Sequence, residues 1–212
     1  MKIKLTGYAA LAGAALFGLS LATAATAADA PKAAETCVGC HGEAGANTEL
    51  DVPNIGGYSA DYMSSALLNF KNKARPCTDT EVRSGSQKGT KTNMCQIAGK
   101  LSDSDMNQLA EYYAEQPFAR KPQQFDAALA EKGKGLFAGR CQDCHGDRGT
   151  LQADNAGIIG GQKMAYLSKQ LKDFKEGKRP YNEKQKRMKQ KLDAATDDEI
   201  KAIVNYLGSI QE

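Results

Sequence analysis

The stretch Cys37-Val38-Gly39-Cys40-His41 decides the fold of this chain, together with its second copy, Cys141-Gln142-Asp143-Cys144-His145. Both follow the pattern C-x-x-C-H, the attachment signature of a c-type haem, in which two thiols add to the porphyrin vinyl groups and the histidine ligates the iron. The chain contains two histidines, and both lie in these motifs. The sequence therefore predicts two covalent haem c groups, held by Cys37, Cys40, Cys141 and Cys144.

The two motifs belong to two copies of a longer unit. A shift of 104 residues places residues 37–76 on residues 141–180 without a gap. Further along, the shift falls to 94 residues, so that Met94 meets Met188. The first copy thus holds ten extra residues between its Arg-Pro pair and its methionine. An internal duplication of this kind predicts two similar domains in tandem.

Both copies carry helical patterns. Apolar residues at helical spacing predict a helix over residues 59–70 and a matching one in the second copy. The last helix of each copy opens with an N-cap residue and an acidic first turn, at Ser102 and at Thr196. Residues 127–138 predict a further helix, and no stretch shows sustained β alternation. The expected fold class is all-α, with each domain wrapped around one haem.

The N-terminus has the pattern of a secretory signal peptide. Two lysines precede an apolar stretch, which ends in the small residues Ala25-Thr26-Ala27. We expect cleavage near Ala28 and a periplasmic mature protein, with an uncleaved membrane anchor as the alternative. The remaining chain is expected to form a first haem domain (28–116), a linker (117–125) and a second haem domain (126–212). Two prolines make this linker semi-extended.

The formal charge is uneven between the halves. Residues 28–115 carry 8 Lys and Arg against 12 Asp and Glu, whereas residues 116–212 carry 18 against 13. The net charges are therefore −4 and +5. A dipolar protein of this kind would orient as it approaches a charged partner. The alternative is that the surface charge only solvates the protein.

The sixth iron position needs a ligand other than histidine, because His41 and His145 are already used. Met, Cys, Lys, Tyr, or an open or water-bound site remain. Met94 and Met188 are favoured because they occupy matching places in the two copies; the alternative is that both fill gaps in the core. Methionine ligation raises the reduction potential. It also leaves no iron position for a substrate, so we expect electron transfer, no catalytic residues and no small-molecule substrate.

With these features the chain resembles the dihaem class I cytochromes c, such as cytochrome c4 and the dihaem subunit of flavocytochrome c sulfide dehydrogenase. The resemblance rests on the two C-x-x-C-H-G motifs, the Gly-Gly turns at 56–57 and 160–161, the Phe…Lys…Arg-Pro segments and the late methionines. It covers essentially all of the mature chain. It implies two mainly helical class I domains, with the haems packed near the interface between them.

The ten extra residues of the first copy depart from the repeat and are bracketed by Cys77 and Cys95. One hypothesis is a disulfide that closes a loop of about 19 residues, worth about 3 kcal/mol in a loop-closure model. The other is that the Cys95 thiolate, rather than Met94, ligates the first iron, as in haem enzymes of sulfur oxidation. The disulfide is favoured, because the second hypothesis leaves Cys77 unpaired.

A basic run surrounds Met188 and predicts a docking surface beside the second haem, for an acidic partner or an anionic membrane surface. The alternative is a solvated helix face. The run consists of Lys178, Arg179, Lys184, Lys186, Arg187, Lys189 and Lys191. Nucleic acid is not an expected partner of an exported haem protein.

Two functions fit these predictions. The first is a periplasmic electron carrier of a respiratory chain, which takes single electrons from a dehydrogenase or a quinol-oxidising donor and passes them to an oxidase or another cytochrome. The second is the electron-accepting subunit of a flavocytochrome c type sulfide dehydrogenase, in which a flavoprotein would be the donor. A haem enzyme with one open or thiolate-ligated iron is the less favoured third hypothesis.

Overall fold

The structure is a computed structural model and describes residues 29–152, 156–181 and 186–211. The expected signal peptide, residues 1–27, lies outside the described residues. The helices of the first half are η1 (Lys32–Ala34), α1 (Glu35–His41), η2 (Glu43–Gly45), α2 (Ala60–Lys71), α3 (Met94–Ala98) and α4 (Asp103–Ala114). Those of the second half are α5 (Ala127–Arg140), α6 (Gln142–His145), η3 (Asp147–Gly149), α7 (Met164–Lys175), α8 (Lys186–Asp193) and α9 (Asp197–Gly208).

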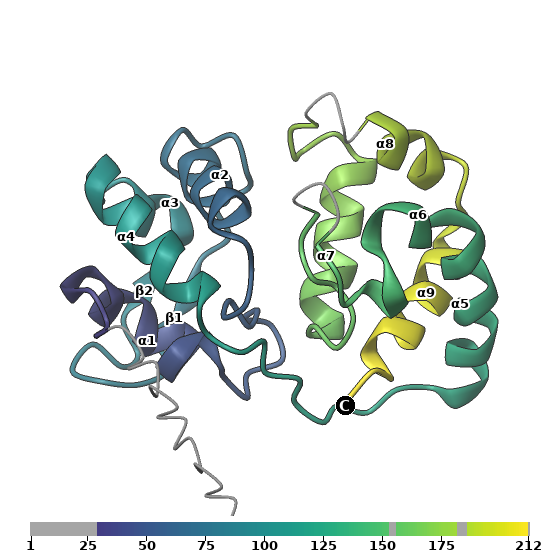
Figure 1. Cartoon of the computed structure of the whole chain (residues 1–212), viewed down its shortest axis with the longest axis horizontal. Helices are drawn as coiled ribbons and strands as arrows, with labels where there is room; N and C mark the ends of the chain where they lie inside the picture. The colour runs from purple at the N-terminus through teal and green to yellow at the C-terminus, as the bar shows by residue number, and fades with distance from the viewer. Residues whose placement is uncertain (1–28, 153–155, 182–185, 212) are drawn as a thin grey trace, which may run out of the picture.

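Two helical bodies lie side by side and are joined by an extended segment between α4 and α5 (Figure 1). The bodies face each other across α2 and α7, which lie on their adjoining sides (Figure 1). The expected all-α fold with tandem domains is therefore confirmed.

The repeat seen in the sequence is reproduced in the helix bounds. Helices α2 and α7 begin and end at positions 104 residues apart, whereas α4 and α9 begin and end at positions 94 residues apart. The change of offset falls between these two helix pairs, as the ten-residue insertion requires.

The capping boxes predicted for the last helices are formed. The Ser102 hydroxyl accepts a hydrogen bond from the Asp105 N–H, while the Asp105 carboxylate accepts one from the Ser102 N–H. Thr196 and Glu199 repeat both bonds at the start of α9. Each box satisfies N–H groups that have no partner within the helix, and this fixes where the helix begins.

Helix α5 packs across α9 in the second half. The crossing is so close that a Cβ atom at Gly133 would collide with the Ala202 carbonyl of α9. Close approach of two backbones is the reason for a glycine inside this helix. In the described part of the first half, only η1 precedes α1, the helix that contains the haem motif.

The inserted residues of the first half form a small antiparallel hairpin, which the sequence did not predict. Its strands are β1 (Thr80–Glu81) and β2 (Lys91–Thr92), with Thr80 opposite Thr92 and Glu81 opposite Lys91. Strands of two residues are too short to show alternating polarity, which explains the missed element.

Each half has its own apolar core. The first contains Met63, Leu67 and Leu109, among others, and the second contains Phe137, Leu167 and Leu207. Ile158, from the second half, is buried in the core of the first half. The two bodies are thus packed against each other as well as linked.

The linker forms hydrogen bonds with both bodies. The Asn54 side chain of the first half donates to the Ala119 carbonyl. Further along, Gln123 accepts a hydrogen bond at 2.9 Å from the N–H of Met164. This bond caps α7, whose N-cap residue Lys163 provides no side-chain cap of its own. Within the described residues, no helix has the length and apolar character needed to cross a membrane.

Candidate haem sites

The first C-x-x-C-H motif lies at the end of α1. Cys37 and Cys40 are one helical turn apart and both are free thiols. His41 is buried, and its Nδ1 lies 2.9 Å from the carbonyl oxygen of Pro53. Nδ1–H donating to this carbonyl leaves Nε2 as the nitrogen that can bind iron. Burial lowers the pKa of His41, outweighing the opposite effect of the Pro53 carbonyl, and this keeps the ring neutral as a ligand must be.

The second motif spans the end of α5 and α6. Cys141 is the C-cap of α5, and His145 is the last residue of α6. Burial again lowers the pKa of the histidine, opposed by the backbone carbonyl of Gly157, which is the counterpart of Pro53. Within the described residues, His145 Nδ1 has no hydrogen-bond partner. The first histidine is therefore held by a hydrogen bond to the backbone, whereas the second is not.

The four motif cysteines are available for thioether bonds. All four are unpaired, whereas the other two cysteines of the chain are joined to each other. Burial raises the pKa of Cys141 to about 11, although Arg140 and Lys191 act against this shift. Lys191 therefore lies close to the attachment site of the second haem.

The two predicted axial methionines lie in different surroundings. Met94 begins α3 and packs half-buried against the first core, as does Cys37. Met188 lies inside α8 and is half-buried, but it is not among the residues packed against the second core. The structure thus brings Met94 and the first motif to one core and leaves Met188 in an outlying helix.

Cys77 and Cys95 are joined in a disulfide, with their Cα atoms 5.6 Å apart. The bond closes the inserted loop at its base, directly beside Met94. The sulfur of Cys95 is therefore not a free thiolate, which removes the basis for the hypothesis that it ligates the first iron.

The inserted hairpin covers the first motif. The Gly39 carbonyl accepts hydrogen bonds from the N–H groups of Arg83 and Ser84, at 2.8 and 3.0 Å. A Cβ atom at Gly39 would lie 2.9 Å from the side chain of Val82, so a glycine fits at this point of contact. The corresponding residue of the second motif is Asp143, which is exposed. The first haem motif is therefore covered by the hairpin at Gly39, whereas the second is exposed to solvent at Asp143.

The predicted docking surface is only partly exposed. Arg179 is 9% exposed and buried between the two bodies, so its assignment to this surface is wrong. It was misplaced because it follows Lys178 in a basic run, although its stacking on Phe174 draws it inward. Lys184 lies outside the described residues. Lys186, Arg187 and Lys191 are exposed, while Lys178 and Lys189 form ion pairs with Glu176 and Asp193.

Matching residues of the two halves meet at the interface between the bodies. Gln162 is completely buried, and its side chain accepts from the Asn54 N–H and donates to the Asn54 carbonyl. In the mirrored contact, the Tyr58 hydroxyl donates to the carbonyl of Ile158, which is the counterpart of Asn54. The two halves are therefore related by an approximate two-fold axis.

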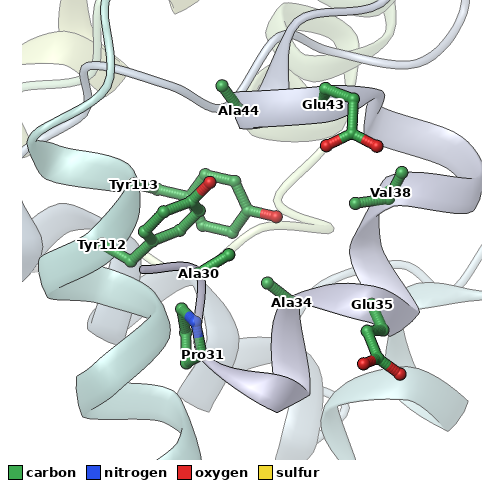
Figure 2. Close-up of a pocket in the computed structure, with 9 residues that line it drawn as sticks. All are labelled: Ala30, Pro31, Ala34, Glu35, Val38, Glu43, Ala44, Tyr112 and Tyr113. Carbon is green, nitrogen blue, oxygen red and sulfur yellow. The ribbon is translucent and has the colours of Figure 1, made fainter. Parts of the chain in front are cut away.

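A pocket of about 350 Å³ opens beside α1 (Figure 2). Its lining residues are Ala30, Pro31, Ala34, Glu35, Val38, Glu43, Ala44, Tyr112 and Tyr113. The rings of Tyr112 and Tyr113 form one side of it (Figure 2). The motif cysteines and His41 do not line it, so it is not the haem cavity.

Four polar residues are central to the interface, and the sequence predicted none of them there: Arg75, Arg179, Gln162 and Gln170. The two arginines carried a signal, since the Arg-Pro pair recurs at the same place in both copies. The glutamines carried none, because their counterparts are Tyr58 and Ala66.

These residues fit a haem c in each half. In the first half, a free cysteine pair, a buried histidine with Nδ1 directed to a backbone carbonyl, and a half-buried methionine on the same core are the donor set that a low-spin haem c needs. The second half provides the free cysteine pair and a histidine whose pKa is lowered by burial. The bound haem would supply one-electron chemistry, while the chain holds and shields it.

Comparisons with known proteins agree with this donor set. The Cytochrome c family model matches residues 27–115 and 130–211. Cytochrome c4 of Pseudomonas aeruginosa is 30% identical over 202 residues, which cover 91% of this chain and 92% of that protein. A protein of Thiomonas intermedia described as a thiosulfate dehydrogenase electron acceptor is 31% identical over 179 residues, covering 80% and 76%.

A solved structure shows the same arrangement of domains. Reduced recombinant cytochrome c4 from Pseudomonas stutzeri superposes with a TM-score of 0.68 at 27% identity, covering 84% of this chain and 94% of that one. Two family matches, two haem motifs and this structural neighbour lead to one conclusion. The chain belongs to the cytochrome c family and is a dihaem, cytochrome c4-like member with two covalently bound haem c groups.

Proposed function

We propose that this dihaem electron-transfer cytochrome is a periplasmic carrier of single electrons. Its donor would be a dehydrogenase or a quinol-oxidising complex, and its acceptor an oxidase or another cytochrome. The observation that carries the proposal is the pairing of each haem motif with a methionine at a matching position, in a chain with no further histidine. Residues 1–27 would direct export, and the haem domains would be residues 28–116 and 126–212, joined by 117–125.

His41 and His145 would be the proximal ligands, and Met94 and Met188 the distal ones. The contact of His41 Nδ1 with Pro53 and the packing of Met94 on the core shared with Cys37 support this assignment in the first half. A thioether ligand stabilises ferrous iron and raises the reduction potential. With both axial positions filled, a substrate has no iron position to occupy.

Partners would dock at the second haem rather than the first. The hairpin covers one side of the first motif, whereas Asp143 leaves the second exposed. Lys191 lies near enough to Cys141 to act on its pKa, and Arg187 is exposed on the same helix. These cations would attract an acidic surface of a redox protein or an anionic membrane surface.

A second candidate is the electron-accepting subunit of a dehydrogenase that oxidises a reduced sulfur compound. Two relatives support it, from Thiomonas intermedia and Stutzerimonas stutzeri, both described as thiosulfate dehydrogenase electron acceptors. A flavocytochrome c type sulfide dehydrogenase is the related alternative. Co-purification of the native protein with a dehydrogenase subunit would favour the subunit role over the free carrier.

Spectro-electrochemical titration of the mature holoprotein tests the carrier proposal. We expect two one-electron steps, low-spin spectra and a methionine–iron charge-transfer band in the ferric form. High-spin spectra, or binding of added ligands at either iron, would contradict it.

The docking proposal has its own test. Electron transfer to an acidic redox partner should slow as salt rises, and Lys191→Glu should remove most of this dependence. The matched control is Lys201→Glu on α9, an exposed lysine in the same half. If both variants reduce the salt dependence equally, electron transfer depends on the net charge of the protein and not on a docking surface at Lys191.

A further inference from the structure

Two pockets lie at equivalent places in the two halves. The first, beside α1, has a volume of about 350 Å³ and is bordered by Tyr112. The second has a volume of about 600 Å³ and is bordered by Tyr206, which corresponds to Tyr112 at the offset of 94 residues. Ala44 of the first pocket corresponds to Arg148 of the second at the offset of 104 residues. The duplication has therefore produced one pocket in two versions.

The two versions differ in charge. In the second half, the Asp147 carboxylate is paired with the guanidinium of the neighbouring Arg148, at 3.7 Å. In the first half, Glu43 stands at the position of Asp147, but Ala44 stands at the position of the cation. Among the described residues, no ion pair includes Glu43 or Glu35, the two carboxylates that line the first pocket. The first pocket therefore has the anion without its cation.

A buried hydroxyl group in the first pocket also lacks a partner. Tyr113 is 1% exposed and lines the pocket, and its hydroxyl has no hydrogen-bond partner among the described residues. Its ring reaches from α4 into the pocket (Figure 2). The corresponding residue of the second half is Leu207, which carries no polar group. Because a buried hydroxyl without a partner is destabilising, its presence points to a ligand.

The Tyr113 hydroxyl and the Glu43 carboxylate lie close enough to act together. Burial raises the pKa of Tyr113, and both Cys37 and Glu43 raise it further. Haem attachment turns the Cys37 thiol into a thioether, which offers the hydroxyl only a weak acceptor. An ammonium ion has three N–H donors and can bind the carboxylate and the hydroxyl oxygen at the same time.

The other walls of the pocket suit an aliphatic chain. Ala30, Ala34 and Val38 are apolar, and the ring of Tyr112 forms part of one side (Figure 2). An aromatic ring beside a cation adds a favourable cation–π interaction. Sites for small molecules have volumes of about 300–1,000 Å³, and this pocket falls within that range. The described residues contain no group of three or more side chains that would hold a metal ion, so an organic cation fits better.

We propose that this pocket binds a small aliphatic amine in its protonated form. The ammonium group would pair with Glu43 and donate a hydrogen bond to the Tyr113 hydroxyl oxygen, while the alkyl chain lies along Val38. Glu35 and Glu43 stand on either side of Val38, so a diamine would place its second ammonium group at Glu35 (Figure 2). The amine would be held and not transformed. The inference requires the first haem domain and does not depend on which donor or acceptor the protein serves.

A bound amine would act on the first haem. Val38 lines the pocket and stands between Cys37 and Cys40, the attachment residues of that haem. A cation at this place favours the added electron of the ferrous state and raises the reduction potential. Binding of the amine and reduction of the first haem would therefore favour each other. The second haem would be unaffected, because Arg148 already supplies a cation to its half of the molecule.

Isothermal titration calorimetry of the mature holoprotein with the short diamine putrescine tests the site. We expect saturable binding, and Glu43→Gln should weaken it about tenfold because a charge-assisted hydrogen bond is lost. The matched control is Glu111→Gln, an exposed carboxylate of α4 outside the pocket lining, which changes the net charge equally. No saturable binding to the parent, or equal losses in the two variants, would overturn the proposal.

A second variant supplies the cation from within the chain. Ala44→Arg reproduces the second half, and the backbone accepts this residue because Arg148 has nearly the same φ, 51° against 52° for Ala44. The folded variant should no longer bind putrescine, whereas Ser104→Arg, at an exposed position of α4 outside the pocket, should still bind it. Binding that survives in Ala44→Arg, or an equal loss in both variants, would place the amine elsewhere and overturn the site.

Two further measurements test the ligand class and its effect. Tetramethylammonium has the charge but no N–H donor, so it should bind at least about tenfold more weakly than putrescine; equal affinities would overturn the hydrogen-bonded ammonium. In spectro-electrochemical titrations, putrescine should raise the potential of the first haem in the parent and not in Ala44→Arg. An unchanged first potential, or an equal rise at both haems, would overturn the action on the first haem, while the low-spin spectra would still report on the carrier proposal.

Discussion

Tyr58 and Gln162 occupy the same position in the two halves of the chain, and they hydrogen-bond to each other at 3.0 Å across the domain interface. The two positions are equivalent in the backbone of the two halves, but one side chain is a phenol and the other an amide. Gln162 also holds both backbone groups of Asn54. One buried amide therefore fastens the two bodies.

Gln162→Ala should loosen the interface. It would leave the Asn54 N–H and carbonyl and the Tyr58 hydroxyl without this partner, at a cost of about 1–3 kcal/mol for each buried group left unpaired. Chemical denaturation should show a free energy of unfolding lower by at least about 2 kcal/mol. The control Gln108→Ala, at an exposed glutamine of α4, should leave it nearly unchanged. Equal stabilities would mean that the interface does not depend on this amide.

Met94→Ala and Met188→Ala should each remove the methionine–iron band of one haem and lower its potential. The expected fall exceeds 59 mV, a tenfold change in the ratio of ferrous to ferric haem. Met106→Leu is the control, because Met106 is buried in the first core and a swap of similar volume costs less than about 1.5 kcal/mol. A band that persists in an alanine variant would show that its methionine is not the ligand.

Gly39→Asp should detach the hairpin from the first motif. The new side chain, which is the one found in the second motif, would press on Val82 and on the Ser84 carbonyl. Overpacking of this kind costs about 1–3 kcal/mol. Amide hydrogen exchange should become faster at Val82, Arg83 and Ser84, while Asp143→Gly should leave the second half unchanged. Unaltered exchange in the hairpin would contradict the contact.

Replacement of Cys77 and Cys95 by serine should lower stability by about 3 kcal/mol, since the closed loop of about 19 residues would be released in the unfolded chain. The loss should affect the first haem more, because the bond lies beside Met94. In thermal melts, the methionine–iron band of the first haem should therefore disappear at a lower temperature than that of the second. Thiol titration of the denatured, unreduced parent should find no free thiol at these two positions, and reactive thiols at both would refute the bond.

The cap of α9 should make stability depend on acid pH. The pKa of Glu199 is lowered, first by the hydrogen bond from the Thr196 N–H and further by Arg140. A carboxyl group whose folded pKa lies below its unfolded value, about 4.3, stabilises the fold above that pH and loses this effect as the pH falls through the folded pKa.

The difference in Tm between the parent and Glu199→Gln should therefore be constant above about pH 5 and shrink below about pH 4. The uncharged change Gln108→Ala should shift Tm equally at every pH. A difference that does not shrink in acid would show that the Glu199 contacts do not depend on its charge.

Much of the fold could be predicted because helix starts, helix faces and haem motifs are each marked by patterns of neighbouring residues. Helix α4 begins at its capping box, and α2 follows its apolar stripe to within a residue of the expected start. The haem cysteines followed from the spacing of the motifs. These features depend on neighbours within a few positions of each other.

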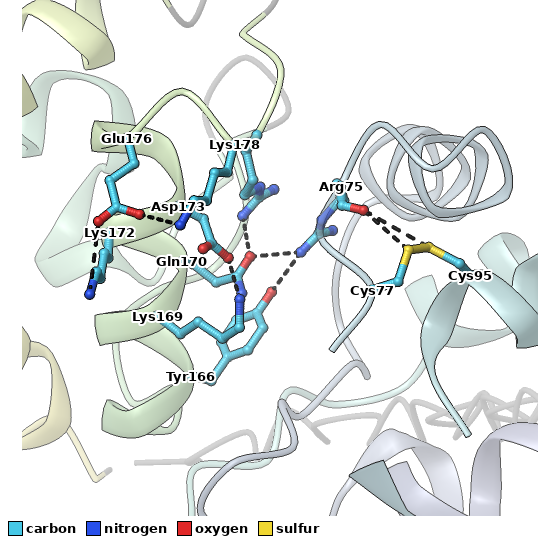
Figure 3. A network of polar contacts seen from close by, with 11 residues as sticks. Arg75, Cys77, Cys95, Tyr166, Lys169, Gln170, Lys172, Asp173, Glu176 and Lys178 are labelled. Carbon is cyan, nitrogen blue, oxygen red and sulfur yellow. Dashed lines mark hydrogen bonds and ion pairs between the residues drawn. A yellow bond between two sulfur atoms is a disulfide. The ribbon is translucent and has the colours of Figure 1, made fainter. Parts of the chain in front are cut away.

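The interface could not be predicted in the same way. Arg75 and Gln170 are far apart in sequence and meet only when both bodies are folded (Figure 3). The repeated Arg-Pro pair marks Arg75 as a shared position, but no local pattern shows that it meets Gln170. Arg179 was wrongly placed on the surface because a basic run predicts exposure, whereas stacking on Phe174 and the shared Gln170 bury it.

The mirrored contacts make the interface isologous, as in a homodimer whose two subunits offer each other the same patch. Here the linker, fixed to one body at Ala119 and to the other at Gln123, turns that association into an intramolecular one. The effective concentration of each half at the other is about millimolar, whatever the concentration of the protein in solution. A contact too weak to hold two separate chains together would still stay formed, and the two haem domains would remain partners at any dilution.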